Sequence, residues 1–248
     1  MHRLFSMTTL GLLLAGSLAN PAVAADRVPV TVENFVRAET HLYFEAVALK
    51  EGGFGKFEHH REVSDVDAQT IIRMNRDTLY SAVVVDLDAG PVTITLPDAG
   101  KRFMSLQTVN EEMYSPPAIY QPGPHTFTRE QNGSRYMIVG VRTLVDPTNP
   151  ADINEVHALQ DELKVEQASP GKLEFPKWDQ ASQNKIRKAL IELGTTLTDT
   201  SKSFGTKDEV DPIQHLISAV EWVRLGRAIR MSLYSKADEA VGPGEAFL

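Results

Sequence analysis

The sequence predicts an α+β fold, with a central antiparallel, β-sandwich-like sheet flanked by an N-terminal helix and C-terminal helices. Three observations predict it. Apolar residues recur every three or four positions between residues 31 and 49, alternate with polar residues over much of 79–144, and return to a helical period after residue 149. Short strands separated by turns favour an antiparallel sheet over alternating strand–helix–strand units.

Residues 1–24 have the layout of a secretory signal peptide. Arg3 lies near the start, an apolar core follows, and the small residues Ala22 and Ala24 precede an expected cleavage site. The apolar core is shorter than the ~20 residues that a membrane-spanning helix needs. The chain has no Cys that could carry a lipid anchor. We therefore expect cleavage near Ala24 and a soluble periplasmic protein without a membrane anchor.

The composition excludes several functional classes. With 42% hydrophobic residues the chain can bury a core, and with no Cys it has neither disulfides nor thiolate metal sites. The formal net charge of −8 is acidic and repels phosphate backbones, so we expect no nucleic-acid partner. An acidic surface with exposed sheet edges is compatible with a homo-oligomer but does not require one.

The first predicted element is a helix that begins at Thr31, its expected N-cap, and ends at Gly52 and Gly53. Its apolar stripe runs from Phe35 to Leu49. Residues 52–69 are predicted to be a loop because they combine glycines with a charged run.

Alternating residues and turn signals then predict a series of strands. The expected strands cover residues 79–87, 92–96, 102–109, 125–129 and 135–144. Between the last two, Asn132 and Gly133 are typical of a β-hairpin turn.

The last third of the chain is predicted to be helical. Asn149 and Pro150 are an N-cap followed by proline at the first helical position, and further helices are expected from Asp179 and from Pro212. We therefore divide the mature chain into an α+β domain, residues 25–167, and a helical C-terminal extension, residues 168–248.

A run of polar residues opens the first predicted strand and is the strongest site candidate. Asp77 and Ser81 are the candidate catalytic residues, as base and nucleophile. The candidate ligand-binding residues in this run are Asn75, Arg76, Thr78 and Tyr80. Strand alternation places Thr78 and Tyr80 on the face opposite Ser81. The alternative is that these side chains are turn residues that bond to their own backbone.

Two arginines inside apolar strands, Arg102 and Arg142, extend this set because a guanidinium can bind an anionic substrate through paired hydrogen bonds. We expect both to reach one cavity together with the polar run. The alternative is that they form structural ion pairs with Asp77, Asp86 or Asp146. Gln107 and Tyr114 complete the candidate ligand-binding residues, the tyrosine as part of a loop rim.

Several motifs are similar to those of the bacterial family known as domain of unknown function 1254. They are Met74–Ser81 (MNRDTLYS), Val85–Leu87, Leu96–Asp98, Lys101–Gln107, Val141–Pro147 and Leu159–Asp161. The resemblance covers residues 30–165 and implies a β-rich domain with flanking helices, but it implies little about activity. Larger relatives carry a second β domain, numbered 1214. This chain resembles a short form that lacks it, so the resemblance implies either that a partner chain completes the site or that the site is confined to the first domain.

A metal site is not expected. His41 and Glu45 have the four-residue spacing of two helical ligands, but Arg37 on the same stripe favours a solvated polar face. The sequence contains no HExxH motif. It does not identify a cofactor.

Two functions follow from these residues. The first is an exported module that binds a small polar or anionic ligand in a cleft at the end of the β core. The alternative is a periplasmic hydrolase of esters or related bonds, with Asp77 as base or as the orienter of a His. For a serine mechanism, Ser81 or Ser105 would have to be assembled with His125 or His215. The sequence contains no G-x-S-x-G nucleophile elbow.

Overall fold

Two antiparallel sheets form the centre of the molecule, whose computed structural model describes residues 27–63 and 76–224. The main sheet has the order β1-β2-β6-β4, formed by Glu58–His60, Thr78–Asp86, Tyr136–Leu144 and Met104–Asn110. The second sheet has the order β5-β3-β7, formed by Gly123–Phe127, Val92–Leu96 and Lys164–Gln167. The predicted α+β class with antiparallel sheets is confirmed.

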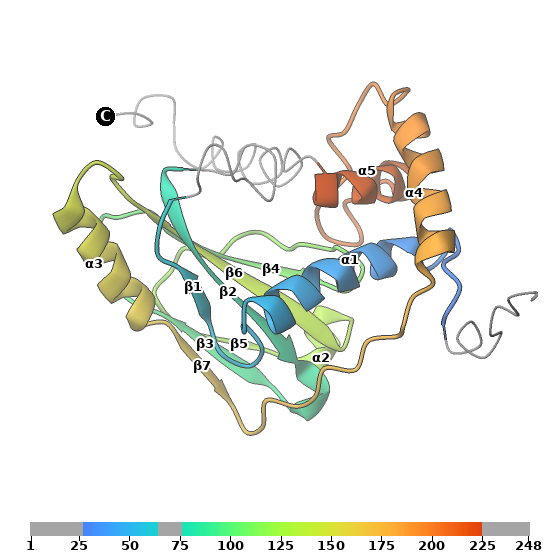
Figure 1. The fold of residues 1–248 in the computed structure, drawn as a ribbon. Coiled ribbons are helices and arrows are strands. Elements are labelled where there is room, and N and C mark those ends of the chain that lie inside the picture. The colour runs from blue at the N-terminus through green and yellow to red at the C-terminus, as the bar shows by residue number, and fades with distance from the viewer. Residues whose placement is uncertain (1–26, 64–75, 225–248) are drawn as a thin grey trace, which may run out of the picture.

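Helices cover the main sheet at both ends. α3 (Pro150–Asp161) lies at one end, and α4 (Gln180–Gly194) and α5 (Pro212–Arg224) lie at the other, beside α1 (Phe35–Glu45) (Figure 1). A π-helical turn, Ala46–Lys50, continues α1. The short α2 (Arg129–Asn132) and a 3₁₀ turn, Leu87–Ala89, complete the helices of the described ranges. None of these helices is long and apolar enough to cross a lipid bilayer.

The two faces of the main sheet bury different cores. On one face Val83 and Val85 of β2 pack with Ile94 of β3, which joins the two sheets. On the other face Val84 packs with Phe35 of α1, in a core that also contains Leu190 of α4 and Ile217 of α5. Consecutive β2 residues serve opposite cores because strand side chains alternate. The first helix and the C-terminal helices thus share one core, opposite the second sheet.

Three helix starts follow local capping rules as predicted. Asn149 accepts a hydrogen bond from Ala151 N–H at the start of α3, and Asp179 accepts one from Ser182 N–H at the start of α4. α5 begins at Pro212. The first helix begins at Phe35, not directly after Thr31, because the side chain of Asn34 accepts a hydrogen bond from Thr31 N–H in a preceding turn.

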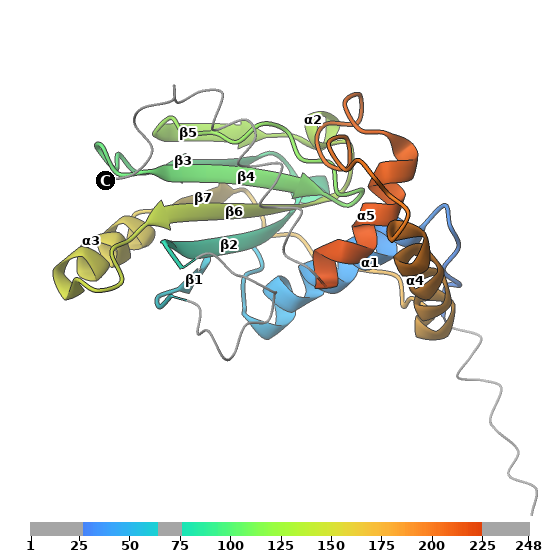
Figure 2. The same cartoon turned by 90° about the horizontal axis from the view of Figure 1, so that it is seen from above.

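The hairpin predicted at Asn132–Gly133 is wrong. β5 pairs with β3 while β6 pairs with β2 and β4, so the strands on either side of this turn lie in different sheets (Figure 2). Gly133 has φ +77° and ends α2 in the left-handed conformation, which glycine adopts without a Cβ clash. Asn-Gly can therefore end a helical turn as well as form a hairpin, and strand pairing decided between them.

Two strands were not predicted. β1 lies inside the expected loop of residues 52–69 and is only three residues long. β7 follows α3 and pairs with β3 over Lys164–Gln167. Both are edge strands too short to show a period, so their strand character comes from the neighbour that they pair with.

Candidate functional site

One face of the main sheet gathers small and polar side chains in its centre. Cross-strand partners share a face, and this face is the one that carries Val84 toward α1. We call the following residues the Gly140 cluster: Thr78, Tyr80 and Ala82 of β2, Gly140 and Arg142 of β6, and Ser105 and Gln107 of β4. Four of them are sequence-predicted ligand residues.

Arg142 is the cation of the Gly140 cluster. Its guanidinium carbon lies 5.4 Å from the centroid of the Tyr80 ring, which is a cation–π distance. The residue is half-buried, and among the described residues no carboxylate lies within ion-pair distance of it and no group accepts a hydrogen bond from it. A guanidinium that is partly withdrawn from water without an anionic partner is costly, so this arrangement favours an anion from outside the chain.

Gly140 leaves space beside this cation. A Cβ added to Gly140 would have no described atom within 4 Å, although the residue lies on a strand paired on both sides. Its cross-strand neighbour Ala82 is also small and only half-buried. Because protein interiors are otherwise close-packed, open space at the middle of a sheet face is where a small molecule can lie.

Tyr43 of α1 lies close enough to Tyr80 and Arg142 for their charges to affect its pKa. Burial, followed by the charges of Glu51 and Tyr80, raises the pKa of Tyr43 to about 12, while Arg142 acts in the opposite direction. The hydroxyl of Tyr43 therefore keeps its proton at neutral pH.

Two buried polar atoms of the Gly140 cluster lack hydrogen-bond partners. Thr78 is 3% exposed, and neither its Oγ1 nor Gln107 Oε1 has a partner among the described residues. Gln107 Nε2 is bonded, at 2.5 Å to both Ser115 Oγ and the Pro116 carbonyl. Buried polar atoms are seldom left unpaired without a reason, and a bound ligand is one such reason.

Replacing Thr78 with Val is expected to raise the free energy of unfolding by about 1–3 kcal/mol, because it removes a buried hydroxyl that bonds to nothing. Equilibrium urea denaturation measures this change. The control is Thr40→Val, which should destabilise the protein because Thr40 Oγ1 donates to the Val36 carbonyl at 2.8 Å. A destabilised Thr78→Val variant would show that the hydroxyl has a partner in solution.

Arg102 lies elsewhere and is fully paired. Its Nη1 and Nη2 donate to the carboxylate of Asp152 at 3.0 and 2.6 Å, and Nη2 also donates to Glu155 at 2.9 Å. Both acidic residues belong to α3, which packs on the Leu79 face of β2. The expectation that Arg102 and Arg142 share one cavity is therefore wrong. Arg102 forms a structural pair instead, with partners other than the three aspartates expected from the sequence.

An open groove of about 640 Å³ lies beside Arg102, between α3 and the turn before β4. Its charged side chains include Lys101 and Arg102 but also Asp98, Glu155 and Glu162. The mixed signs and the paired state of Arg102 give this groove no preference for one charge.

The other residues predicted to form the site do not belong to the Gly140 cluster. Arg76 and Asp77 are exposed at the start of β2, where the Asp77 carbonyl accepts a hydrogen bond from Val145 N–H. Asn75 lies outside the described residues. Tyr114 stacks on His215 with ring centroids 5.0 Å apart.

Ser81 lies on the opposite face of β2 from the Gly140 cluster and meets His59. Ser81 Oγ lies 2.8 Å from His59 Nδ1 and accepts a hydrogen bond from Gln160 Nε2 at 3.2 Å. The serine proton is then best placed toward His59 Nδ1. Burial and the charge of Arg61 lower the pKa of His59, which favours the neutral imidazole that can accept it. The contact is a serine–histidine pair, but Ser81 is only 1% exposed.

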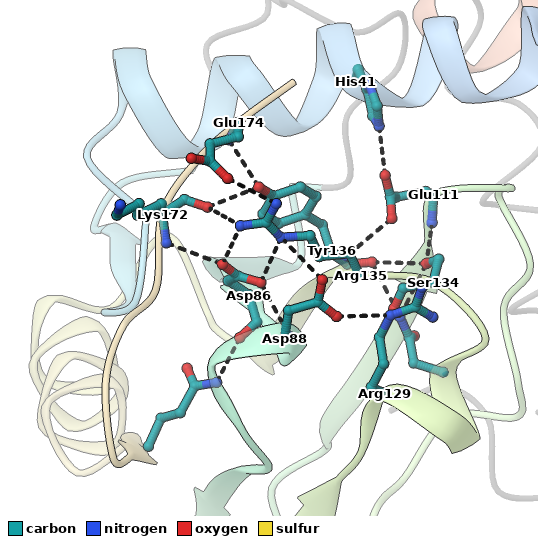
Figure 3. A network of polar contacts seen from close by, with 12 residues as sticks. His41, Asp86, Asp88, Glu111, Arg129, Ser134, Arg135, Tyr136, Lys172 and Glu174 are labelled. Carbon is teal, nitrogen blue, oxygen red and sulfur yellow. Dashed lines mark hydrogen bonds and ion pairs between the residues drawn. The ribbon is translucent and has the colours of Figure 1, made fainter. Parts of the chain in front are cut away.

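A buried polar network lies between α1 and the end of β4, on the side of the sheet that carries Val84 (Figure 3). Trp178 Nε1 donates to His41 Nδ1 at 3.0 Å, so His41 Nε2 carries the proton and donates to Glu111 at 2.8 Å. Glu111 also accepts Tyr136 N–H at 3.1 Å. Burial alone would raise the pKa of Glu111, but these bonds lower it. His41 is 2% exposed, so its predicted solvated environment is wrong.

Within residues 27–63 and 76–224, no group of three or more His, Asp and Glu side chains is placed to hold a metal ion. His41, one of the two spaced candidates on α1, uses both ring nitrogens for Trp178 and Glu111.

Tyr43 and Gly140 are site residues that the sequence analysis missed. Tyr43 lies on the apolar period of the first helix and is indistinguishable there from a core aromatic residue. Gly140 interrupts the apolar run Ile138–Val141, and an isolated glycine within a strand can mark a close approach of another molecule. That signal was available.

One solved structure shares this fold, and a family model matches part of the chain. Residues 54–140 match the family model described as "Protein of unknown function (DUF1254)". The chain is similar to the crystal structure of the VPA0106 protein from Vibrio parahaemolyticus, with TM-score 0.59 and 15% identity over 77% of this chain and 64% of that one. An uncharacterized protein from Burkholderia cenocepacia has TM-score 0.32 and 11% identity over 84% of this chain and 52% of that one. The chain thus spans less than two thirds of either. No curated protein matches it.

Proposed function

We propose that this chain, which carries the DUF1254 family match over residues 54–140, is an exported binding protein for a small organic anion. The ligand lies in the open space of the Gly140 cluster, against Arg142. One observation carries the proposal: the half-buried Arg142 shares a sheet face with the open Cβ position of Gly140 and has no anionic partner among the described residues.

The other arginines withdrawn from solvent show why this observation carries weight. Arg102, Arg135 and Arg187 each contact a carboxylate of a neighbouring element, namely Asp152, Asp86 and Glu39. Within the described ranges, the fold therefore neutralises these three partly buried guanidinium groups inside the chain. Among these four arginines, only Arg142 lacks a carboxylate partner within the described residues. A ligand carboxylate would supply that partner through paired hydrogen bonds.

The residues around Gly140 suit a small molecule. The floor of the site is formed by Gly140 and Ala82, and the Tyr80 ring lies beside the cation. A planar carboxylate can lie against the guanidinium edge while apolar atoms of the ligand contact the small floor residues. The expected export of the chain fits a protein that meets solutes outside the cytoplasm, and this location is part of the proposal.

A thermal-shift experiment with acetate, propionate, lactate and benzoate tests this proposal. At about 100 times Kd a ligand adds about 2.7 kcal/mol of stability, which corresponds to a rise in Tm of roughly 5–10 °C for a chain of this length. We expect such a shift with at least one of these acids.

The matched variant is Gly140→Val. Gly140 has no positive φ, and valine favours strands, so the variant should fold with unchanged or higher stability while its side chain fills the site. It should lose the ligand-induced shift. An equal shift in Gly140→Val would place the ligand elsewhere, and no shift with any acid in the wild type would contradict the proposal.

A hydrolase is the second candidate function, favoured by the 2.8 Å contact between Ser81 and His59. This pair involves neither His125 nor His215, the histidines considered from the sequence. Two facts weigh against the hydrolase function. Ser81 is 1% exposed, so a substrate could not reach it without a rearrangement, and it lies across the sheet from the anion-binding groups. A nucleophile must contact the reacting carbonyl.

The hydrolase hypothesis has a direct test in the turnover of a chromogenic acetate ester. If the pair is catalytic, Ser81→Ala and His59→Gln each lower kcat by about 100-fold or more, while Arg142→Met leaves kcat unchanged. Because Ser81 is buried, the folding of each variant is checked by circular dichroism. Wild-type protein without turnover, or turnover that survives in folded Ser81→Ala, would eliminate this candidate.

A further inference from the structure

We infer that His215 is a pH-sensitive link between the C-terminal helices and the turn after β4, closed when its ring is protonated and released at Glu112 when the ring is neutral. His215 lies on α5 and is 5% exposed. Its Nδ1 lies 2.7 Å from the Ser203 carbonyl oxygen, and its Nε2 lies 2.8 Å from the Glu112 carbonyl oxygen. We call these two contacts the His215 link, and residues 111–115 the β4 turn. The inference does not depend on the proposed anion site.

The two contacts of the His215 link require two ring protons. A carbonyl oxygen can only accept a hydrogen bond, and a neutral imidazole has only one N–H. With a neutral ring, the lone pair of one nitrogen would face an oxygen at hydrogen-bond distance, which is repulsive. Only the imidazolium donates to Ser203 and Glu112 at the same time. The arrangement in the structure is therefore that of a protonated His215.

The other histidines of the described ranges provide an internal comparison. His41 has a donor at one ring nitrogen and an acceptor at the other, as a neutral ring requires. The remaining four each use one ring nitrogen for a described contact, and they are His59, His60, His125 and His157. Within these ranges, two carbonyl oxygens at both ring nitrogens occur only at His215.

The surroundings of the ring contain few charges. Within the described ranges no carboxylate lies within ion-pair distance of His215. The carboxylate of Glu112 pairs with Arg37 of α1, and that of Asp211 accepts backbone N–H groups at the start of α5. Tyr114 stacks on the His215 ring with centroids 5.0 Å apart. The two carbonyls and the face of Tyr114 are therefore the groups that stabilise a cation here.

Burial determines where the ring gains its second proton. It lowers the pKa of His215 below the ordinary value of 6.5, while the hydrogen bond to the Ser203 carbonyl acts in the opposite direction. The ring is therefore neutral at neutral pH and becomes charged in mild acid. The Ser203 contact is buried and the Glu112 contact is only partly buried, so water can replace the ring at Glu112. Acidification should close the link at Glu112.

The β4 turn is the segment whose attachment depends on this link. Met113 at its centre has φ +58°, which residues with a Cβ seldom adopt, and is 1% exposed, so contacts with its surroundings hold the turn in place. One such contact is the hydrogen bond from Ser115 N–H to the Gly205 carbonyl at 2.8 Å, which involves no titratable group. The contact of Glu112 with His215 also joins the turn to the C-terminal part of the chain, and it depends on a proton. Acid should therefore strengthen this junction.

NMR spectroscopy of the full-length chain, with ¹⁵N-labelled histidine and ¹³C-labelled carbonyls, tests the link between about pH 8 and about pH 5. Above the transition we expect one ring proton on His215, at Nδ1, and below it two, with the fold retained. The carbonyl shift of Glu112 should change with the same midpoint. The bond from the charged ring should raise the ratio of bonded to unbonded Glu112 carbonyl by at least roughly tenfold.

The matched variants are His215→Asn and His125→Gln. Asparagine places an amide N–H near the position of Nδ1, so it can keep the Ser203 contact, but it does not titrate and is too short to reach Glu112. The Glu112 shift should then be independent of pH over this interval. His125 has one described carbonyl contact and lies on β5 of the second sheet, so His125→Gln should leave the transition unchanged.

Four results would overturn the inference. Two concern the ring, which would carry one proton, or two protons, over the whole pH interval in folded protein. The third is a ring transition without a matching change at the Glu112 carbonyl. The fourth is a Glu112 transition that persists in folded His215→Asn. The wild-type titration decides even if His215→Asn does not fold.

Discussion

Replacing Arg135 with Met is expected to lower the free energy of unfolding by about 3–5 kcal/mol, because it leaves a buried carboxylate without its cation. Asp86 is 2% exposed, and Arg135 donates to it from Nε at 2.9 Å and from Nη2 at 2.8 Å (Figure 3). Lys172 N–H is a further donor at 3.0 Å, and this bond ties the segment before α4 to the end of β2. Equilibrium urea denaturation at neutral pH measures the loss.

The matched control is Arg129→Met. Arg129 pairs with Asp88 at 3.0 Å, but the two side chains are 47% and 51% exposed, so solvent screens their attraction. Removing this pair should change stability by less than about 1 kcal/mol. Similar losses in both variants would show that the Asp86 pair is no more important than a surface contact.

The Asp86 pair also predicts how stability depends on pH. Burial alone would raise the pKa of Asp86, but the bonds from Arg135, Lys172 and Asp88 lower it below the ordinary value of 3.8. A carboxyl whose pKa is depressed in the folded state stabilises the protein above its unfolded pKa, and this contribution is lost as the pH falls through the folded pKa. The wild type should therefore lose stability below about pH 4, and Arg135→Met should lose less over the same interval.

Replacing Arg142 with Met is expected to weaken carboxylate binding by at least roughly 30-fold, because the cation supplies the charge-assisted bonds to the ligand. The fold should not suffer, since among the described residues Arg142 has no ionic partner to leave unpaired. Stability should remain equal or increase. Titration calorimetry with the best acid of the thermal-shift set measures the affinity, and urea denaturation measures the stability.

Two further arginine variants separate charge from geometry. Arg142→Lys keeps the charge but cannot form two parallel hydrogen bonds, so its affinity should fall between those of the wild type and Arg142→Met. Arg102→Met should lower the stability and leave ligand binding unchanged, because Arg102 forms ion pairs with Asp152 and Glu155. Arg142→Met should have the reverse effects. If Arg102→Met abolished binding while Arg142→Met did not, the ligand would belong to the groove beside α3.

The sequence predicted the parts of this fold that depend on short-range interactions. A capping side chain acts over three residues, so Asn149 and Asp179 mark the starts of α3 and α4 as predicted. The alternation along β2 placed Tyr80 and Ser81 on opposite faces, as observed. The residue types that can bind an anion, Arg142 among them, were also recognisable in the sequence.

The tertiary structure decided which of two similar arginines is available. Arg102 and Arg142 both lie in or beside apolar strands, and nothing local distinguishes them. Asp152, the partner of Arg102, is 50 residues away along the chain and is brought to it by the packing of α3. The partner of Ser81 was decided in the same way, since His59 reaches it only because β1 pairs with β2.

By itself, then, the sequence determined where α3, α4 and α5 begin, which faces the side chains of β2 occupy and which residues can carry chemistry. Only the tertiary structure decided how strands pair across the two sheets, that Arg102 is neutralised while Arg142 is not, and that Gly140 borders open space. The physical reason is the distance along the chain over which each interaction acts. Backbone periodicity and capping act over a few residues, whereas a charge is paired or left unpaired by packing between elements that are distant in the chain.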